Sequence, residues 1–169
     1  MHGTAGDDEA DAATRQTAEA LADWGPNVRA RWKMVADTEV TPEMMASRNL
    51  VLVGNAALNG IVARMADKLP IRQDATGTHA AGRPVAGPDA SFRLVHPNPL
   101  APGRYVLVYG AGSAAGLKRL LPAAGGRPPS PLADYVVLGE DGQTALAGYF
   151  KDDWTITESR AGAARQPAR

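Results

Sequence analysis

The sequence contains no cysteine, which excludes disulfide bonds, thiolate catalysis and cysteine-based zinc sites. It has only three histidines, His2, His79 and His96, and none of them pairs with another histidine or a glutamate at metal-ligand spacing. We therefore expect no metal site, and nothing in the sequence indicates a cofactor.

Aromatic residues make up only 5% of the chain, so the core must be built from leucine, valine, isoleucine and alanine. Eighteen basic and 18 acidic residues give a formal net charge of zero. A neutral chain has no overall electrostatic attraction for nucleic acid or an anionic membrane. No apolar run approaches the roughly 20 residues that a transmembrane helix needs. We expect neither a nucleic-acid partner nor a transmembrane segment.

The length of 169 residues fits one domain. The first ten residues are polar and acidic, and the last fifteen are polar and poor in apolar side chains. We therefore predict a disordered lead over 1–10, a single α/β domain over 11–154 and a disordered tail over 155–169. The acidic N-terminus also lacks the basic start and apolar middle of a signal peptide, so the residues themselves leave the location of the protein open.

Hydrophobic periodicity and Gly/Pro breaks predict strands and helices in alternation. The helices are expected at 11–24, 42–48, 56–69 and 113–121. The strands are expected at 28–35, 50–53, 71–73, 92–95, 105–109 and in a hairpin of 135–138 with 144–150. Residues 74–89 are expected to form a loop or loose hairpin, and 122–131 a loop.

This alternation favours the α/β class, because a helix between two strands usually makes those strands parallel. We predict a three-layer, mostly parallel open sheet of the Rossmann or flavodoxin type, with the C-terminal antiparallel hairpin at one edge. The continuous apolar run of residues 50–53 is typical of a strand that is buried on both faces.

Two strand–glycine–helix units are the best candidates for a binding site, because a helix N-terminus offers free N–H groups to an anion. The candidate residues are Gly110, Gly112, Ser113, Asn55 and Asn59. The glycine spacing differs by one residue from the dinucleotide fingerprint, and the acidic residue which that motif needs is missing. Tight turns and helix caps at these five positions are the alternative interpretation.

No catalytic residue is predicted. Ser113 is followed by Ala-Ala-Gly instead of completing Gly-x-Ser-x-Gly, and no histidine follows it in the chain. Two carboxylate pairs, in Asp37-Thr38-Glu39 and in Asp152-Asp153-Trp154, are expected in solvated turns, with Trp154 packed against the domain. They could form a calcium or acid–base site only if the two segments met in space.

Two strings, Asp37-Thr38-Glu39-Val40 and Pro97-Asn98-Pro99-Leu100, together with the segment that ends at Trp154, carry a resemblance to a bacterial domain. From about Trp32 to Trp154 the chain resembles the C-terminal extension of secreted prolyl-oligopeptidase-like and esterase-like α/β-hydrolase proteins. The resemblance implies an extracellular or periplasmic location and a hydrolase catalytic domain as partner, with the nucleophile in that domain. A weaker similarity links the first strand–glycine–helix unit to S-layer-type cell-surface modules.

Three functions therefore stand as hypotheses. The first is a non-catalytic accessory domain of a peptidase- or esterase-like hydrolase, with a partner domain that contacts the N-terminal helix. The second is a domain that binds a small molecule or anion at Gly110, Gly112 and Ser113. The third is a structural module of the cell surface.

Overall fold

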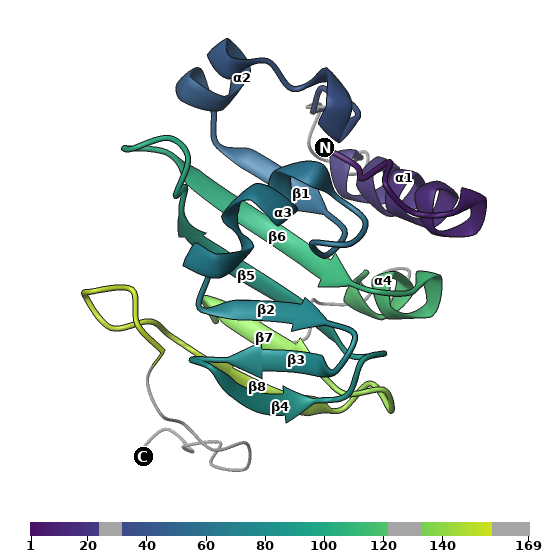
Figure 1. Cartoon of the computed structure of the whole chain (residues 1–169), viewed down its shortest axis with the longest axis vertical. Coiled ribbons are helices and arrows are strands. Elements are labelled where there is room, and N and C mark those ends of the chain that lie inside the picture. Colours follow the sequence, from purple (N-terminus) through teal and green to yellow (C-terminus); the bar gives the residue numbers. More distant parts are fainter. Residues whose placement is uncertain (24–31, 122–132, 157–169) are drawn as a thin grey trace.

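The computed structural model describes residues 1–23, 32–121 and 133–156 (Figure 1). The α-helices in these residues are α1 (Asp8–Ala22), α2 (Pro42–Ser47), α3 (Gly60–Met65) and α4 (Ala114–Leu120). Short 3-10 turns are η1 (Asp37–Glu39) and η2 (Ala66–Lys68). The strands are β1 (Leu50–Val53), β2 (Ile71–Asp74), β3 (Gly77–Ala80), β4 (Arg83–Ala86), β5 (Ser91–Pro97), β6 (Tyr105–Ala111), β7 (Tyr135–Leu138) and β8 (Thr144–Gly148).

The larger sheet has five strands in the order β1-β6-β5-β7-β8. Only β1 and β6 run parallel among these pairs, with Leu50 opposite Val106. The β5–β6, β5–β7 and β7–β8 pairs are all antiparallel. The predicted Rossmann- or flavodoxin-like, mostly parallel sheet is therefore wrong, although helices and strands do alternate along much of the chain.

The connection between β5 and β6 explains this correction. The backbone N–H of Asn98 donates to the Arg104 carbonyl (2.7 Å), and the Asn98 side-chain oxygen accepts from Leu100 N–H (2.9 Å). These bonds close a compact turn, so β6 folds back beside β5 and must run antiparallel to it. The sequence predicted a strand that ends at residue 95, two residues before the end of β5, and the reversal of the chain direction after it was missed.

The second sheet is small, with three antiparallel strands in the order β2-β3-β4. It is formed by the predicted strand at 71–73 together with much of the segment expected to be a loop or loose hairpin. In Figure 1 it lies in front of β5, β7 and β8.

One face of the five-stranded sheet carries the main hydrophobic core. Leu52, Val108 and Leu94 are fully buried there beside Ile61 of α3 and Ile71 of β2. The helix α3 and the small sheet therefore cover this face. Burial of the apolar side chains between these elements and the five-stranded sheet stabilises the fold.

The opposite face is covered only in part by the described residues. Val53 and Ala111 pack with Ala18 of α1 and Leu117 of α4. A separate cluster joins Leu120 of α4 to Val136 and Leu138 of β7. Both helices thus lie over the end of the sheet where β1 and β6 terminate.

The N-terminal residues lie along the free edge of β1. The N–H of Val53 donates to the Met1 carbonyl (3.0 Å), and the N–H of Gly3 donates to the Val53 carbonyl (3.2 Å). His2 also forms a bridge with Ala36. The edge of the sheet is thereby paired, within a stretch for which the sequence predicted a disordered lead.

Several boundaries differ from the expected ones. The first helix begins at Asp8, where the Asp7 side chain accepts from Ala10 N–H (2.9 Å) and caps it. The helix expected from 56 begins at Gly60, because residues 55–59 form a turn held by side-chain amides. Of the strand expected at 28–35, residues 32–35 form no strand, and 28–31 lie outside the described residues.

Other local predictions are confirmed. The helix expected at 42–48 is present as α2, which Thr41 caps by accepting from Met44 N–H (3.2 Å). The C-terminal hairpin is present as β7 and β8. The loop expected at 122–131 lies outside the described residues.

Candidate functional site: an apolar groove beside the first strand

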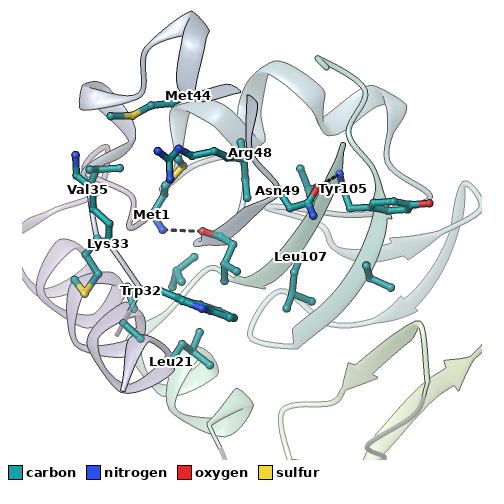
Figure 2. Close-up of a pocket in the computed structure, with 18 residues that line it drawn as sticks. Met1, Leu21, Trp32, Lys33, Val35, Met44, Arg48, Asn49, Tyr105 and Leu107 are labelled. Atoms are coloured by element: carbon teal, nitrogen blue, oxygen red, sulfur yellow. Dashed lines mark hydrogen bonds between the residues drawn. The ribbon is translucent and has the colours of Figure 1, made fainter. Parts of the chain in front are cut away.

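A groove of about 650 Å³ opens on the partly covered face of the five-stranded sheet. Its floor is formed by β1, β5 and β6, and its walls by α1, the segment 32–35, and the residues from Met44 to Asn49 (Figure 2). This volume is within the range of typical small-molecule sites.

The floor of the groove is apolar. Val51, Leu107 and Val95 lie side by side on this face, because Val51 pairs with Leu107 and Leu107 pairs with Val95. All three remain only half-buried, whereas Leu52 and Val108, their neighbours on the other face, are fully buried. The strands therefore present aliphatic side chains that the described residues cover only in part.

Two aromatic residues lie at the rim. The side chain of Trp32 is 44% exposed and that of Tyr105 is 43% exposed, and both line the groove. Large apolar side chains at an open concave surface often mark a contact site.

Among the described residues that line the groove, the basic side chains are Lys33 and Arg48, both exposed. Neither side chain forms a hydrogen bond or ion pair with any other residue that the structure describes. Figure 2 shows both on the side of the groove nearer Val35, away from Leu107. Their positive charges are consequently available to a ligand.

The amino group of Met1 also lies at the groove, where it donates to the Val51 carbonyl (2.7 Å). Burial lowers its pKa to about 6, and the Asp37 carboxylate opposes this shift in part. At neutral pH this amine is therefore largely uncharged, so Lys33 and Arg48 carry most of the positive charge among the described residues that line the groove.

The described lining of the groove carries few reactive side chains. Among the described residues that line the groove there is no histidine, serine, threonine, aspartate or glutamate. The Asn49 side chain, a polar group at the rim, already accepts from Tyr105 N–H (2.9 Å). The groove can hold an apolar molecule, and its described lining offers no serine or threonine hydroxyl and no carboxylate or imidazole base.

The sequence-predicted site lies at the opposite end of β1 and β6. The structure brings Gly112 and Asn55 together, since a Cβ on Gly112 would lie 3.2 Å from the Asn55 amide nitrogen. That nitrogen donates to the Gln73 side-chain oxygen (3.2 Å), and the Gln73 amide donates to the carbonyls of Pro88 and Ala90 (2.8 and 2.7 Å). Asn55 therefore links the turn after β1 to the small sheet.

The remaining predicted site residues are also engaged within the chain. The Asn59 side chain accepts from Ile61 and Val62 N–H (3.0 and 3.1 Å) and donates to the Val53 carbonyl (3.0 Å). The Ser113 hydroxyl accepts from Gly116 N–H (3.1 Å), which confirms its interpretation as the helix cap.

Gly110 has a packing role. A Cβ at this position would overlap the ring of Phe92, which is buried across from it on β5. The glycine-rich stretch thus allows close approach of an aromatic side chain. Gly54, at the end of β1, has a φ of +110°, which a residue with a side chain rarely adopts.

Ser113 and His96 belong to opposite ends of the sheet. His96 is paired with Val106, whereas Ser113 follows Ala111, which is paired with Ser91. The strand between Val106 and Ala111 alone spans roughly 17 Å. A direct hydrogen bond between the serine hydroxyl and this imidazole is therefore excluded.

The two carboxylate pairs have different surroundings. Asp37 is buried, and its oxygens accept from Thr4 Oγ1 (2.7 Å), Thr38 N–H (3.0 Å) and Gly60 N–H (2.6 Å). It thereby joins the N-terminal segment to the start of α3.

Asp152 and Asp153 are exposed in the turn after β8. Asp153 accepts from the Thr155 hydroxyl and N–H (2.6 and 3.0 Å), and these bonds lower its pKa. Trp154 packs against His96, Phe150 and Tyr105, as expected from the sequence. Of the described residues, no three acidic or histidine side chains are grouped so that they could hold a metal ion.

A cluster of Asp74, Thr76 and His79 on the β2–β3 hairpin was not singled out from the sequence. Thr76 Oγ1 donates to Asp74 Oδ1 (2.5 Å) and lies 3.0 Å from His79 Nε2. The Thr76 hydroxyl and backbone bonds lower the Asp74 pKa to about 2, so this carboxylate stays ionised and is a poor general base at neutral pH. The cluster closes a turn on an exposed hairpin.

Sequence reasoning also missed the groove. Val51 belongs to a run that was expected to be buried on both faces, and Trp32 and Lys33 belong to a segment expected to be a strand. An uncovered sheet face has no local signature, because the same valine and leucine pattern serves a covered face equally well.

Fold and site define an α/β protein with a five-stranded mixed sheet, a small antiparallel sheet and an apolar groove. Comparison with protein-family models, with curated proteins and with solved structures finds no match for this chain. None of the helices that the structure describes is both long enough and apolar enough to cross a membrane.

Proposed function

We propose that this protein is a non-catalytic binding domain and that the groove beside β1 is its binding site. The observation that carries the proposal is the half-buried row of Val51, Leu107 and Val95 on the floor of a groove of about 650 Å³. Covering these side chains removes apolar surface from water, which favours binding by about 25 cal/mol per Å² before the costs of association.

The non-catalytic part of the proposal is supported by the composition of the groove lining. Catalysis of acyl or phosphoryl transfer requires a nucleophile, base or metal at the place where the substrate binds. The polar side chains of the described lining belong to Lys33, Arg48, Asn49, Tyr105 and Trp32, and the Met1 amine already donates to the Val51 carbonyl (2.7 Å). These groups bind and orient a ligand.

A neutral fluorescent probe, N-phenyl-1-naphthylamine, tests the proposal without involving charge. We expect saturable binding with one probe per chain. Leu107→Lys should weaken this binding at least tenfold, because it places a charge on the apolar floor. Tyr149→Lys is the matched control, since Tyr149 is 56% exposed and does not line the groove. Binding that is unsaturable, or equal in the two variants, would contradict the proposal.

A second candidate function is docking onto a hydrolase catalytic domain, as the resemblance of the sequence implies. Its support is the exposure of Trp32 and Tyr105 at the rim, because exposed aromatic residues are enriched at protein interfaces. The groove also includes Ala18 and Leu21 of α1, the helix that the sequence predicted to contact a partner.

Docking is tested by affinity purification of the protein from its native cells, followed by labelling with a fluorophosphonate probe of serine hydrolases. A labelled partner should be retained by Tyr149→Ala and lost with Trp32→Ala. The isolated chain itself should show no labelling and no ester hydrolysis. If the isolated chain were labelled at Ser113, the accessory hypothesis would fail.

A further inference from the structure

The charge around the groove is distributed unevenly. Lys33 and Arg48 both lie toward one end, and Figure 2 shows Leu21, Trp32 and Leu107 toward the other. The described lining contains no acidic side chain that could neutralise either cation. A ligand that fits both ends must therefore combine an apolar body with a negative charge at one end.

We infer that the groove binds a free single-chain amphiphile with a carboxylate head, of the fatty-acid type. The head lies at Lys33 and Arg48, and the hydrocarbon chain lies over Val51, Leu107 and Val95. This inference rests on the proposed function and adds the chemical class of the ligand.

The carboxylate end follows from the two basic side chains. An arginine guanidinium can donate two parallel hydrogen bonds to a carboxylate, and a lysine ammonium adds a compact positive charge. Both side chains are exposed and free of described partners, so binding breaks no existing ion pair.

The hydrocarbon end follows from the residue types on the floor. Valine and leucine offer no hydrogen bond to a polar molecule, so a sugar or a nucleotide base would lose its water without replacement. A methylene chain has no such cost. A single-chain amphiphile with a carboxylate head satisfies the apolar and the cationic parts together.

The test compares three ten-carbon probes that differ only in the head group: decanoate, decanol and decyltrimethylammonium. Each is titrated into the protein by calorimetry, below the concentration at which it aggregates. We expect decanoate to bind at least tenfold more tightly than decanol, and decyltrimethylammonium to bind most weakly. The double variant Lys33→Gln/Arg48→Gln should lose the preference for decanoate and keep its affinity for decanol.

A matched control removes the same charge elsewhere. Arg64 and Lys68 are exposed on α3 and η2 and do not line the groove, so Arg64→Gln/Lys68→Gln should leave all three affinities unchanged. Circular dichroism verifies that both double variants remain folded, which their surface positions favour.

The outcomes separate this inference from the proposed function. Equal affinities for decanoate and decanol, with the neutral naphthylamine probe still bound, would overturn the carboxylate inference and leave the groove as a binding site. Failure of every apolar probe would overturn both. Binding to anionic vesicles without binding of monomeric decanoate would overturn the inference in favour of a membrane-surface contact.

Discussion

On one face of the five-stranded sheet, Leu52 and Val108 are fully buried beneath α3 and the small sheet. On the other face, their neighbours Val51 and Leu107 form part of an open groove. The same two strands thus contribute alternate residues to a core and to a candidate binding site. The comparison shows that aliphatic side chains in a strand serve either purpose, and that the covering elements decide which.

The strand–glycine–helix units show the same division. After β1 the chain enters α3, which packs into the core face. After β6 it enters α4, which packs on the opposite face with α1. Because α1 and α4 both lie toward the terminal ends of β1 and β6, the starting ends of these strands remain open at the groove.

The largest expected effect comes from matched leucine substitutions on the two faces. Leu52→Ala should lower the free energy of unfolding by about 2–5 kcal/mol, because it leaves a cavity in a fully covered core. Leu107→Ala should cost about 1 kcal/mol or less, since its side chain is half-exposed. Denaturant unfolding measures both values. Equal losses would mean that the groove face is as well covered as the core face.

The caps of α3 and α4 extend the comparison to the helices that lie on the two faces of the sheet. Asn59→Ala should cost about 2–3 kcal/mol, because the fully buried side chain serves two N–H groups and one carbonyl. Ser113→Ala should cost about 1 kcal/mol, because it removes a single bond at a partly exposed helix start. Thermal unfolding of the two variants checks the order. A larger loss for Ser113→Ala than for Asn59→Ala would mean that the cap of α4 contributes more to stability than the cap of α3.

Gly110 and Gly112, two residues of the predicted ligand site, are expected to differ in how much space their surroundings leave for a side chain. Gly110→Ala should cost about 1–3 kcal/mol, because its methyl group must displace the Phe92 ring from the core face. Gly112→Ala should cost less than about 1 kcal/mol, since its Cβ would be 3.2 Å from a side-chain amide that needs only a small shift. Denaturant midpoints distinguish the two. A strong effect at Gly112 alone would argue for a structural demand at the turn itself.

The smallest expected effect is a dependence of the free energy of unfolding on pH that arises from His96. Burial lowers the pKa of His96, whose Nδ1–H donates to the Pro97 carbonyl (2.8 Å) and whose ring meets Phe150 and Trp154. Its folded pKa lies below the ordinary value of 6.5, so the unfolded chain binds more protons below that pH. This contribution to stability is therefore present above pH 6.5 and is lost as the pH falls through the folded pKa.

His96→Gln tests this effect, because it removes the titrating ring while keeping a polar side chain. The free energy of unfolding should decline less between pH 7 and pH 5 in the variant than in the parent chain. Taking the difference between the two proteins cancels the contribution of the Met1 amine, whose pKa is about 6 in the folded chain. Parallel pH curves would show that His96 does not contribute.

Local signals predicted most elements but not their directions. The apolar runs located β1 and β6, and the helices expected at 42–48 and 113–121 are present as α2 and α4. The antiparallel course of β5 and β6 was missed, because it depends on hydrogen bonds that close the turn after Pro97. Hydrophobic periodicity reports which residues are apolar in a strand, and it carries no information on which way the strand runs.

The candidate site depended still more on long-range structure. Asn55, Asn59, Gly110, Gly112 and Ser113 were visible in the sequence as turn and cap residues, and the structure assigns caps or close packing to several of them. Trp32, Lys33 and Arg48 gave no such signal, since each is ordinary in its own segment.

The sequence by itself determined the absence of thiol chemistry, the neutral charge, the aliphatic core and the positions of most strands and helices, because these follow from composition and short-range pattern. Tertiary structure alone decided the mixed sheet, the division of β1 and β6 between a closed and a partly open face, and the presence of Lys33 and Arg48 at the rim of one groove. The reason is physical. Burial and charge proximity depend on which distant segments cover a surface, and no local run of residues encodes that.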